Sequence, residues 1–142
     1  MKRSFAVVLA IPAILAACTP SIDPAYMSKS VAELIADTKN EDGLVRSQAA
    51  LTLGQKKSKE AVPDLIKLLG DKQKHVRYRA MVALRMIGSN AVPSLIIATS
   101  DSNRNVRFFS GQALKGIPSK EAQDGYKAYM DKEGSKILKV ET

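Results

Sequence analysis

The chain has 142 residues, with 22 basic and 14 acidic side chains and a formal net charge of +8. This length suits one domain, and the single cysteine excludes an intramolecular disulfide, so an apolar core must hold the fold. The basic balance favours anionic partners such as lipid headgroups, acidic proteins or surface polysaccharide, and it equally serves solubility.

Residues 1–17 are predicted to be a targeting segment that is not part of the fold. Lys2 and Arg3 precede an apolar run from Phe5 to Leu15, which is shorter than the roughly 20 residues that span a bilayer. Two alanines and then Cys18 follow this run. The order of basic, apolar and small residues before a cysteine resembles a bacterial lipoprotein signal peptide with its lipobox.

That resemblance implies cleavage before Cys18, a diacylglyceryl thioether on Cys18 and a fatty acyl group such as palmitate on its amino end. Two or more acyl chains anchor a protein stably in a membrane. Residues 18–27 would then be a lipidated tether, in which Thr19–Tyr26 would reach at most about 28 Å if fully extended. Thr19 stands where an aspartate would signal inner-membrane retention. The resemblance therefore implies the periplasmic face of the outer membrane, or the outer face of the membrane in a host that has only one.

A location outside the cytoplasm makes nucleic acid an unexpected partner. The alternative is an ordinary secreted protein with an incidental cysteine.

Beyond the tether, the sequence repeats about every 30 residues, which is typical of stacked structural units. The segment Ala61–Ile66 returns as Ala91–Ile96, and an earlier copy begins at Val31. A later half copy places Tyr126 where the preceding copy has Ile96. Other pairs at the same offset are Asp71 and Asp101, Arg77 and Arg107, Leu84 and Leu114, and Ile87 and Ile117.

Each copy is predicted to form two helices, because apolar residues recur at helical spacing over residues 61–69 and again over residues 74–87. Ser30 and Glu33 form a capping-box pattern. Asn90 and Ser119 are predicted N-caps. Pro63 and Pro93 fit first helical turns, whereas Gly70, Gly88 and Pro118 fit helix exits. We expect no sheet and no further membrane-spanning segment.

This repeat pattern resembles the HEAT-like repeat family, in particular its short phycobilisome-lyase type, from about Ser30 to Met130. The resemblance implies an all-α, short right-handed α-solenoid of about three and a half helical hairpins over residues 28–130. The last half repeat would cap the stack, and residues 131–142 would form a polar C-terminal tail. In this family an aspartate of the turn and an arginine of the second helix form a structural ladder between repeats. The candidates are Arg46, Asp71, Arg77, Asp101 and Arg107.

The outer side of each second helix, opposite its core stripe, is a candidate binding surface. Tyr78 and Phe108 would stack there between Arg85 and Lys115, and aromatic plus arginine side chains are typical of protein-binding hot spots. The alternative is that both rings only cover neighbouring repeats. The candidate protein-binding residues are Tyr78, Val82, Arg85, Phe108, Gln112 and Lys115. Ser47, Leu51, Met81 and Gly111 are predicted to be exposed on the same side.

We predict no catalytic residues, no metal site and no cofactor. His75 is the single histidine, so neither a histidine-rich metal site nor the paired His-Glu steps of HEAT-like hydroxylases is present. The predicted function is a membrane-anchored, non-catalytic scaffold or assembly adaptor that binds another protein of the cell envelope. A remoter alternative is a lyase-like or hydroxylase-like enzyme accessory. Another is a binder of anionic polymer or lipid through Lys56, Lys57, Lys59, Lys72, Lys74, Arg79 and Arg85.

Overall fold

A computed structural model describes the backbone of residues 23–138 and the side chains of residues 23–133. The predicted signal peptide, Cys18 and the first part of the tether lie outside the described residues. Within them every regular element is helical, which confirms an all-α solenoid.

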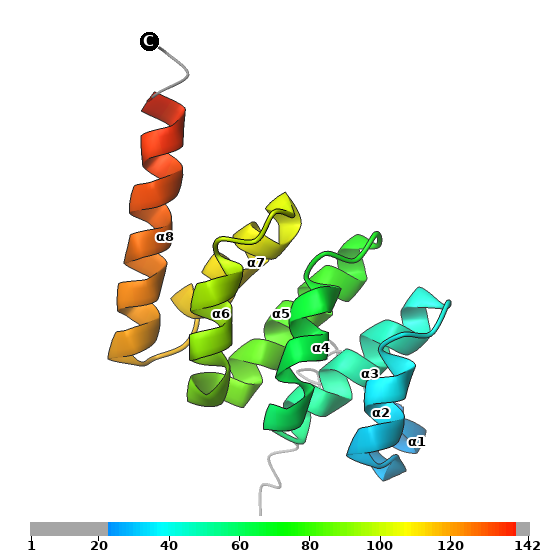
Figure 1. The fold of residues 1–142 in the computed structure, drawn as a ribbon. Helices are drawn as coiled ribbons and strands as arrows, with labels where there is room; N and C mark the ends of the chain where they lie inside the picture. The colour runs from blue at the N-terminus through cyan, green and yellow to red at the C-terminus, as the bar shows by residue number, and fades with distance from the viewer. Residues whose placement is uncertain (1–22, 139–142) are drawn as a thin grey trace, which may run out of the picture.

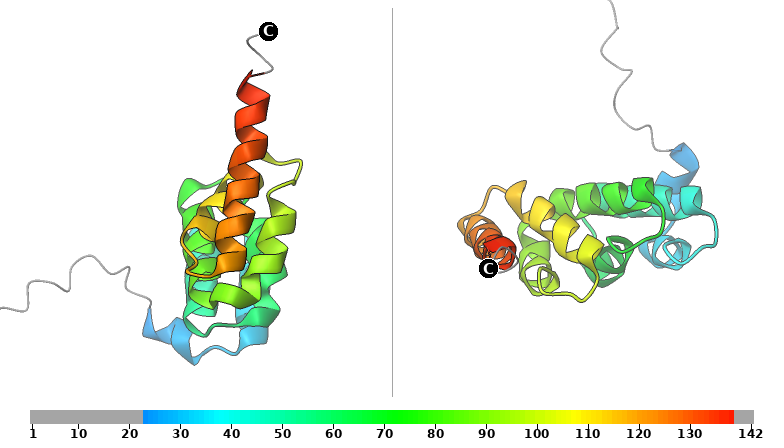
Figure 2. Two further views of the ribbon diagram at one scale, coloured as in Figure 1. Left: turned by 90° about the vertical axis from the view of Figure 1, so that its left-hand side faces the viewer. Right: turned by 90° about the horizontal axis from the view of Figure 1, so that it is seen from above.

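The helices pair into hairpins that stack side by side in two rows (Figures 1 and 2). The first row holds α2 (Val31–Asp37), α4 (Val62–Leu68) and α6 (Val92–Ala98). The second row holds α3 (Gly43–Gln55), α5 (Lys74–Ile87) and α7 (Arg104–Lys115). Helix α1 (Pro24–Ser28) lies at one end, and α8 (Lys120–Leu138) lies at the other and extends past the stack. The 3₁₀ turns η1 (Lys59–Ala61) and η2 (Gly88–Ala91) lead into α4 and α6.

Local chemistry explains several helix starts. The capping box is confirmed: the Glu33 N–H donates to Ser30 Oγ at 3.3 Å, and the Ser30 N–H donates to Glu33 Oε2 at 2.8 Å. Ser119 also acts as predicted, since its Oγ accepts from the Ala122 N–H at 3.2 Å. Asp42 and Asn103 cap α3 and α7 in the same manner.

The predicted N-cap at Asn90 is wrong. The η2 turn carries the chain one residue further, so Ala91 is the N-cap of α6 and gives no side-chain hydrogen bond. Pro93 supports this start because it lies in the first turn of the helix, where its missing N–H costs nothing. Gly88 ends α5 with a φ of 73°, a conformation that favours glycine.

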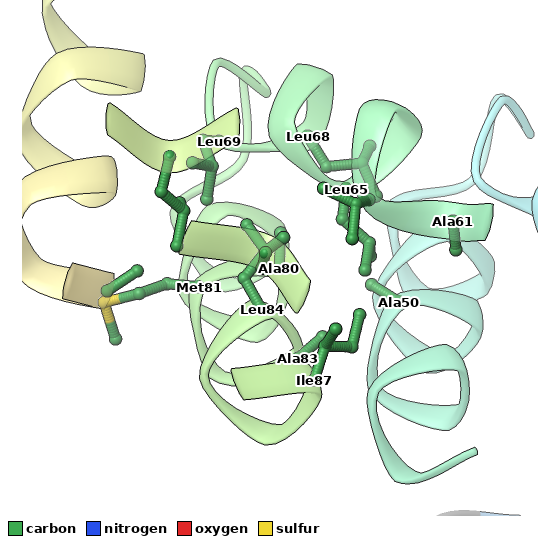
Figure 3. Packing of buried hydrophobic residues seen from close by; sticks show 14 of the residues in the cluster. Ala50, Ala61, Leu65, Leu68, Leu69, Ala80, Met81, Ala83, Leu84 and Ile87 are labelled. Carbon is green, nitrogen blue, oxygen red and sulfur yellow. The ribbon is translucent and has the colours of Figure 1, made fainter. Parts of the chain in front are cut away.

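The core consists of one buried row of side chains that runs through all the hairpins. Figure 3 shows the part of this row in which residues of α3, α4 and α5 pack together. Each complete hairpin supplies one leucine from its first helix and one from its second. These leucines are Leu34 and Leu53, Leu65 and Leu84, and Leu95 and Leu114, and all six are fully buried. Full burial of one such side chain contributes about 1.5–3 kcal/mol. Every complete repeat therefore contributes to the stability of the stack.

One described segment, Lys74–Ala98, is long and apolar enough to span a membrane by length and composition, because an 18-residue window within it has a mean hydropathy of 1.5. It is not one helix, because the chain turns at Gly88 between α5 and α6. Its leucines and valines belong to the solenoid core. We therefore assign this segment to the packed domain, although the sequence was expected to contain no such stretch.

The structure changes both ends of the predicted domain. Pro24–Ser28 is helical, and Tyr26 packs against the core, so the predicted tether is not extended over its whole length. At the other end, α8 continues to Leu138 without a break between Met130 and Asp131. No proline interrupts this part of the sequence.

Candidate protein-binding face

Two hollows lie side by side on the surface formed by α5, α7 and α8, which we call the B-face. The first, the α5–α7 hollow, has a volume of about 270 Å³ and is lined by Tyr78, Met81, Arg85, Phe108, Phe109 and Gln112. The second, the α7–α8 hollow, has a volume of about 290 Å³ and is lined by Arg104, Arg107, Phe108, Gln112, Tyr126, Tyr129, Met130 and Glu133. Phe108 and Gln112 border both hollows and form the ridge between them.

Some of the predicted binding residues line a hollow of the B-face, and others do not. Tyr78 is 57% exposed and Phe108 is 48% exposed, and both rings border the α5–α7 hollow together with Arg85 and Gln112. Lys115 is exposed outside the hollows, with its Nζ 5.8 Å from the centre of the Tyr126 ring. Val82 lines neither hollow, because it packs against the core cluster.

Four residues that were expected on this exposed side are buried: Ser47, Leu51, Met81 and Gly111. The helical periodicity gave their direction correctly, but each second-row helix turns this side toward the next helix of the stack. Tyr129 of α8 covers Gly111, and a Cβ atom at Gly111 would lie 2.5 Å from its ring. A neighbouring helix therefore hides positions that a single helix would leave in water.

The ring of Phe108 packs against the neighbouring ring of Phe109. Phe109 meets it edge to face, with 5.3 Å between ring centres and an interplanar angle of 82°. The Arg77 guanidinium lies 5.8 Å from the centre of the Phe109 ring. An aromatic side chain that is already ordered loses little entropy when a partner covers it, so Phe108 is well placed as a binding anchor.

The electrostatics of the B-face are basic. Arg85, Arg104 and Arg107 line the hollows, and Glu133 is the carboxylate among the lining residues. Glu133 Oε1 lies 3.8 Å from Arg107 Nε. Burial raises the pKa of Tyr129, so its hydroxyl keeps its proton at neutral pH and can donate a hydrogen bond. The face thus offers two aromatic rings, cations and a phenol donor.

The predicted arginine–aspartate ladder is present between the first two hairpins. Arg46 Nε and Nη2 donate to the Asp71 carboxylate at 2.8 and 2.9 Å, and both side chains are more than nine-tenths buried. Arg46 Nη1 also donates to the carbonyls of Asn40 and Glu41 at 2.8 Å. Burial raises the pKa of Asp71, but hydrogen bonds from Arg46 and from the Gln73 N–H outweigh burial and hold it below its ordinary value.

The next rungs differ. Arg77 and Arg107 each donate to two carbonyls of their own turn. The ion pairs of the described residues do not join Arg77 to Asp101, and Arg77 Nε has no hydrogen-bond partner among them. Asp101 instead accepts from the Asn103 N–H at 2.7 Å. Arg107 approaches Glu133 of α8, so the closing helix supplies the acid at the last rung.

Residues 31–115, more than half of the chain, match the family model described as HEAT repeats. The chain belongs to the HEAT repeat family. Members of this family are generally protein-interaction scaffolds without catalytic activity. No curated protein matches the chain.

Sequence reasoning missed an apolar groove between α4 and α6, on the first-row side of this HEAT repeat protein. It has a volume of about 540 Å³ and is lined by Pro63, Ile66, Lys67, Ser94, Ile97, Ala98, Ser100 and Asp101. Ile97 is 76% exposed. The available signal was an isoleucine at the position where the preceding copy has Lys67.

The seven basic residues of the anionic-polymer hypothesis do not share one surface of the HEAT stack. Lys56, Lys57 and Lys59 follow α3, whereas Lys72 and Lys74 lie at the start of α5. Since α3 and α5 run in the same direction, these two groups lie at opposite ends of the hairpins (Figure 1). Arg79 Nη1 is buried within the stack.

Among residues 23–133, no three histidine, cysteine, aspartate or glutamate side chains lie together in a group that could hold a metal ion. His75 is exposed in the first turn of α5.

Proposed function

We propose that this HEAT repeat protein is a non-catalytic scaffold or assembly adaptor of the bacterial cell envelope, and that the B-face binds its protein partner. The observation that carries the proposal is the pair of half-exposed rings, Tyr78 and Phe108, on the rim of one hollow beside Arg85. Binding energy at protein interfaces concentrates on such aromatic and arginine anchors in pockets.

The charge of the B-face supports an acidic partner surface. Arg85 and Arg104 are exposed beside the rings, and the salt bridges found among the described residues at 4.0 Å or less involve neither of them. A partner that brings a carboxylate and an apolar side chain together would satisfy a cation and fill a hollow at once. Complementary charge would also raise the rate of encounter.

The proposed location depends on the N-terminal sequence. The order of basic, apolar and small residues before Cys18 supports lipidation of that cysteine and anchoring at the periplasmic face of the outer membrane. The repeat spacing of about 30 residues supports the short, phycobilisome-lyase type of HEAT repeat. The activity of those lyases is not part of the proposal.

Photo-crosslinking in the native host tests the proposed face. A photo-crosslinking residue at Phe108 should give one dominant protein adduct. The same residue at Ile97, which is more exposed but lies on the other row, is the matched control. No protein adduct from a folded, membrane-bound protein, or the same adducts from both positions, would contradict binding at the B-face.

Labelling with a radioactive or clickable palmitate tests the anchor separately. Wild-type protein should carry the label and sediment with membranes, and Cys18→Ser should lose both properties while its helical circular dichroism stays unchanged. A labelled Cys18→Ser variant, or an unlabelled wild type, would remove the lipoprotein assignment and leave the B-face to be judged on its own.

A further inference from the structure

Three lysines lie near one another at the end of the hairpins on which α1, the first described helix, is also found. Lys56, Lys57 and Lys59 lie in the connection from α3 to α4, and all three are exposed. Figure 1 places this connection and α1 at the same end of the hairpins. Lys56 joins them directly, because its Nζ donates to the Met27 carbonyl of α1 at 2.9 Å. We call these three lysines together with Met27 the lysine end.

The positive charge of the lysine end is only partly offset, because three lysines face one nearby carboxylate, that of Glu60, which interacts with Lys59. The ion pairs within the described part of the chain include none of the three lysines. Glu60 is the adjacent acid, and hydrogen bonds from its own backbone N–H and from the Ser58 hydroxyl lower its pKa. Ser58 is buried, so this bond ties Glu60 to the turn.

Lys57 occupies a position in this turn at which glycine is the favoured residue. The Lys57 N–H donates to the Gly54 carbonyl at 3.0 Å and the Ser58 N–H donates to the Leu53 carbonyl at 3.1 Å, which is the hydrogen-bond pattern of a Schellman C-cap. Lys57 has a φ of 50° in the left-handed region, where glycine is usual. A lysine that is kept in a disfavoured conformation is a reason to look for a role of its charge.

The start of the described chain indicates what this end faces. If Cys18 carries the acyl chains, residues 18–22 separate the membrane from Asp23 and span at most about 17 Å when extended. A tether this short allows the lysine end to come within the roughly 10 Å of the headgroups over which charges act at 0.1 M salt. Lysines near an anionic leaflet are attracted to it.

We propose that the lysine end docks on anionic phospholipid headgroups of the leaflet that holds the anchor. This inference builds on the proposed lipid anchor and adds an orientation to it. The hairpins stand on the membrane with the α3–α4 connection toward the lipid, and the turns that carry Asp71 and Asp101 point away. Met27, which is 43% exposed, meets the headgroup layer beside the lysines.

Methionine oxidation measures this orientation. The full-length protein is expressed in a bacterial host, purified from membranes and reconstituted in vesicles of phosphatidylcholine alone or with phosphatidylglycerol. Met27 and Met130 are matched reporters, since they are 43% and 47% exposed and lie on α1 and α8. On the anionic vesicles we expect Met27 to oxidise about fivefold more slowly, with Met130 unchanged. High salt should remove the difference.

Two double variants, each of which removes two positive charges, test whether the lysines of the lysine end bind the headgroups. Lys57→Gly with Lys59→Gln should abolish the protection of Met27. Lys72→Gln with Lys74→Gln removes the same charge at the opposite end and should retain it. Loss of protection in both variants, equal protection of Met27 and Met130, or protection that does not depend on phosphatidylglycerol would overturn the proposal. Because Lys57→Gly suits the turn, misfolding of the first variant is not expected, and its melting temperature checks this.

Failure of the anchor can be told apart from failure of docking. The mass of the N-terminal peptide shows whether Cys18 is acylated. If it is not, the sole thiol of the chain is coupled to a maleimide lipid in the same vesicles, and the Met27 measurement is repeated. Protection of Met27 after this coupling would support the lysine end even though the natural anchor had been disproved. Its absence would disprove both.

Discussion

The junction between α3 and α5 is closed, whereas the junction between α5 and α7 is open, although the repeats that form them share one sequence pattern. In α3, the side that leads to the next hairpin carries Ser47, Ala50 and Gly54, and Gly54 lies directly against Ala83. The equivalent positions of α5 are Tyr78, Met81 and Arg85, and they line a hollow. Small side chains let two helices approach, and large ones hold them apart.

The arginine–aspartate ladder also differs between the closed and the open junction. At the closed junction Arg46 reaches the carboxylate of the next hairpin, but at the open junction Arg77 lies toward the Phe109 ring and Asp101 stays in its own turn. A repeat pattern therefore specifies that hairpins stack, while the residues off the pattern decide how closely. The α5–α7 hollow of the B-face exists because this junction is open.

The largest expected effect comes from removing the equivalent arginines one at a time. Arg46→Ala leaves a buried carboxylate without its partner and should lower the free energy of unfolding by about 3–5 kcal/mol. Arg77→Ala loses hydrogen bonds to two carbonyls and should cost about 1–2 kcal/mol. Urea denaturation of both variants measures the difference. Equal losses would mean that the two junctions are energetically alike.

Acid should act first on the closed junction. The pKa of Asp71 is lower in the folded protein than in the unfolded chain, so its contribution to stability is complete above the unfolded value of about 4. That contribution is lost as the pH falls below about 4 and through the folded value. Urea midpoints between pH 5 and pH 2 should therefore fall more steeply for wild type than for Asp71→Asn. Parallel pH profiles would show that Asp71 is not the responsible group.

The same substitution at two glycines tests the spacing of the helices. A Cβ at Gly54 would lie 2.5 Å from the Ala83 Cα, so Gly54→Ala should force α3 and α5 apart and cost about 1–3 kcal/mol. A Cβ at Gly116 would meet the flexible end of Arg85, so Gly116→Ala should change stability by no more than about 0.5 kcal/mol. Thermal unfolding of the two variants gives the comparison. A stable Gly54→Ala protein would contradict the closed junction.

The rings of the open junction are expected to contribute little to stability. Tyr78→Ala combined with Phe108→Ala removes half-exposed side chains and should cost about 1 kcal/mol or less, yet abolish partner capture. Pull-down from envelope extracts and thermal unfolding are measured on the same samples. A large drop in melting temperature would mean that the rings serve packing, and retained capture would move the binding site elsewhere.

The regular part of this architecture could be read from the sequence because local signals repeat in each copy. The second helix of the second copy was predicted at 74–87 and α5 spans Lys74–Ile87. The core leucines and the capping box at Ser30 also follow from periodicity and end chemistry. These features depend on contacts within one hairpin, which is what a sequence pattern encodes.

The parts that could not be predicted depend on contacts between hairpins. Met81 and Gly111 were assigned to an exposed side because a helical wheel contains no neighbouring helix. The unequal fates of Arg46 and Arg77 are also invisible in the repeat, since both follow a valine at the same position. The one clue was side-chain size: Gly54 aligns with Arg85, and that contrast separates a closed junction from an open one.

Helix α8 also governs how this protein behaves at high concentration. An α-solenoid is built by adding like units to its last face, and nothing in that process distinguishes a repeat of the same chain from a repeat of another molecule. Here Tyr129 occupies the notch at Gly111, and Gly125 packs against Ile96, so the last face is filled before a second molecule can reach it. We therefore expect α8 to limit the stack to one molecule and to oppose end-to-end growth into filaments.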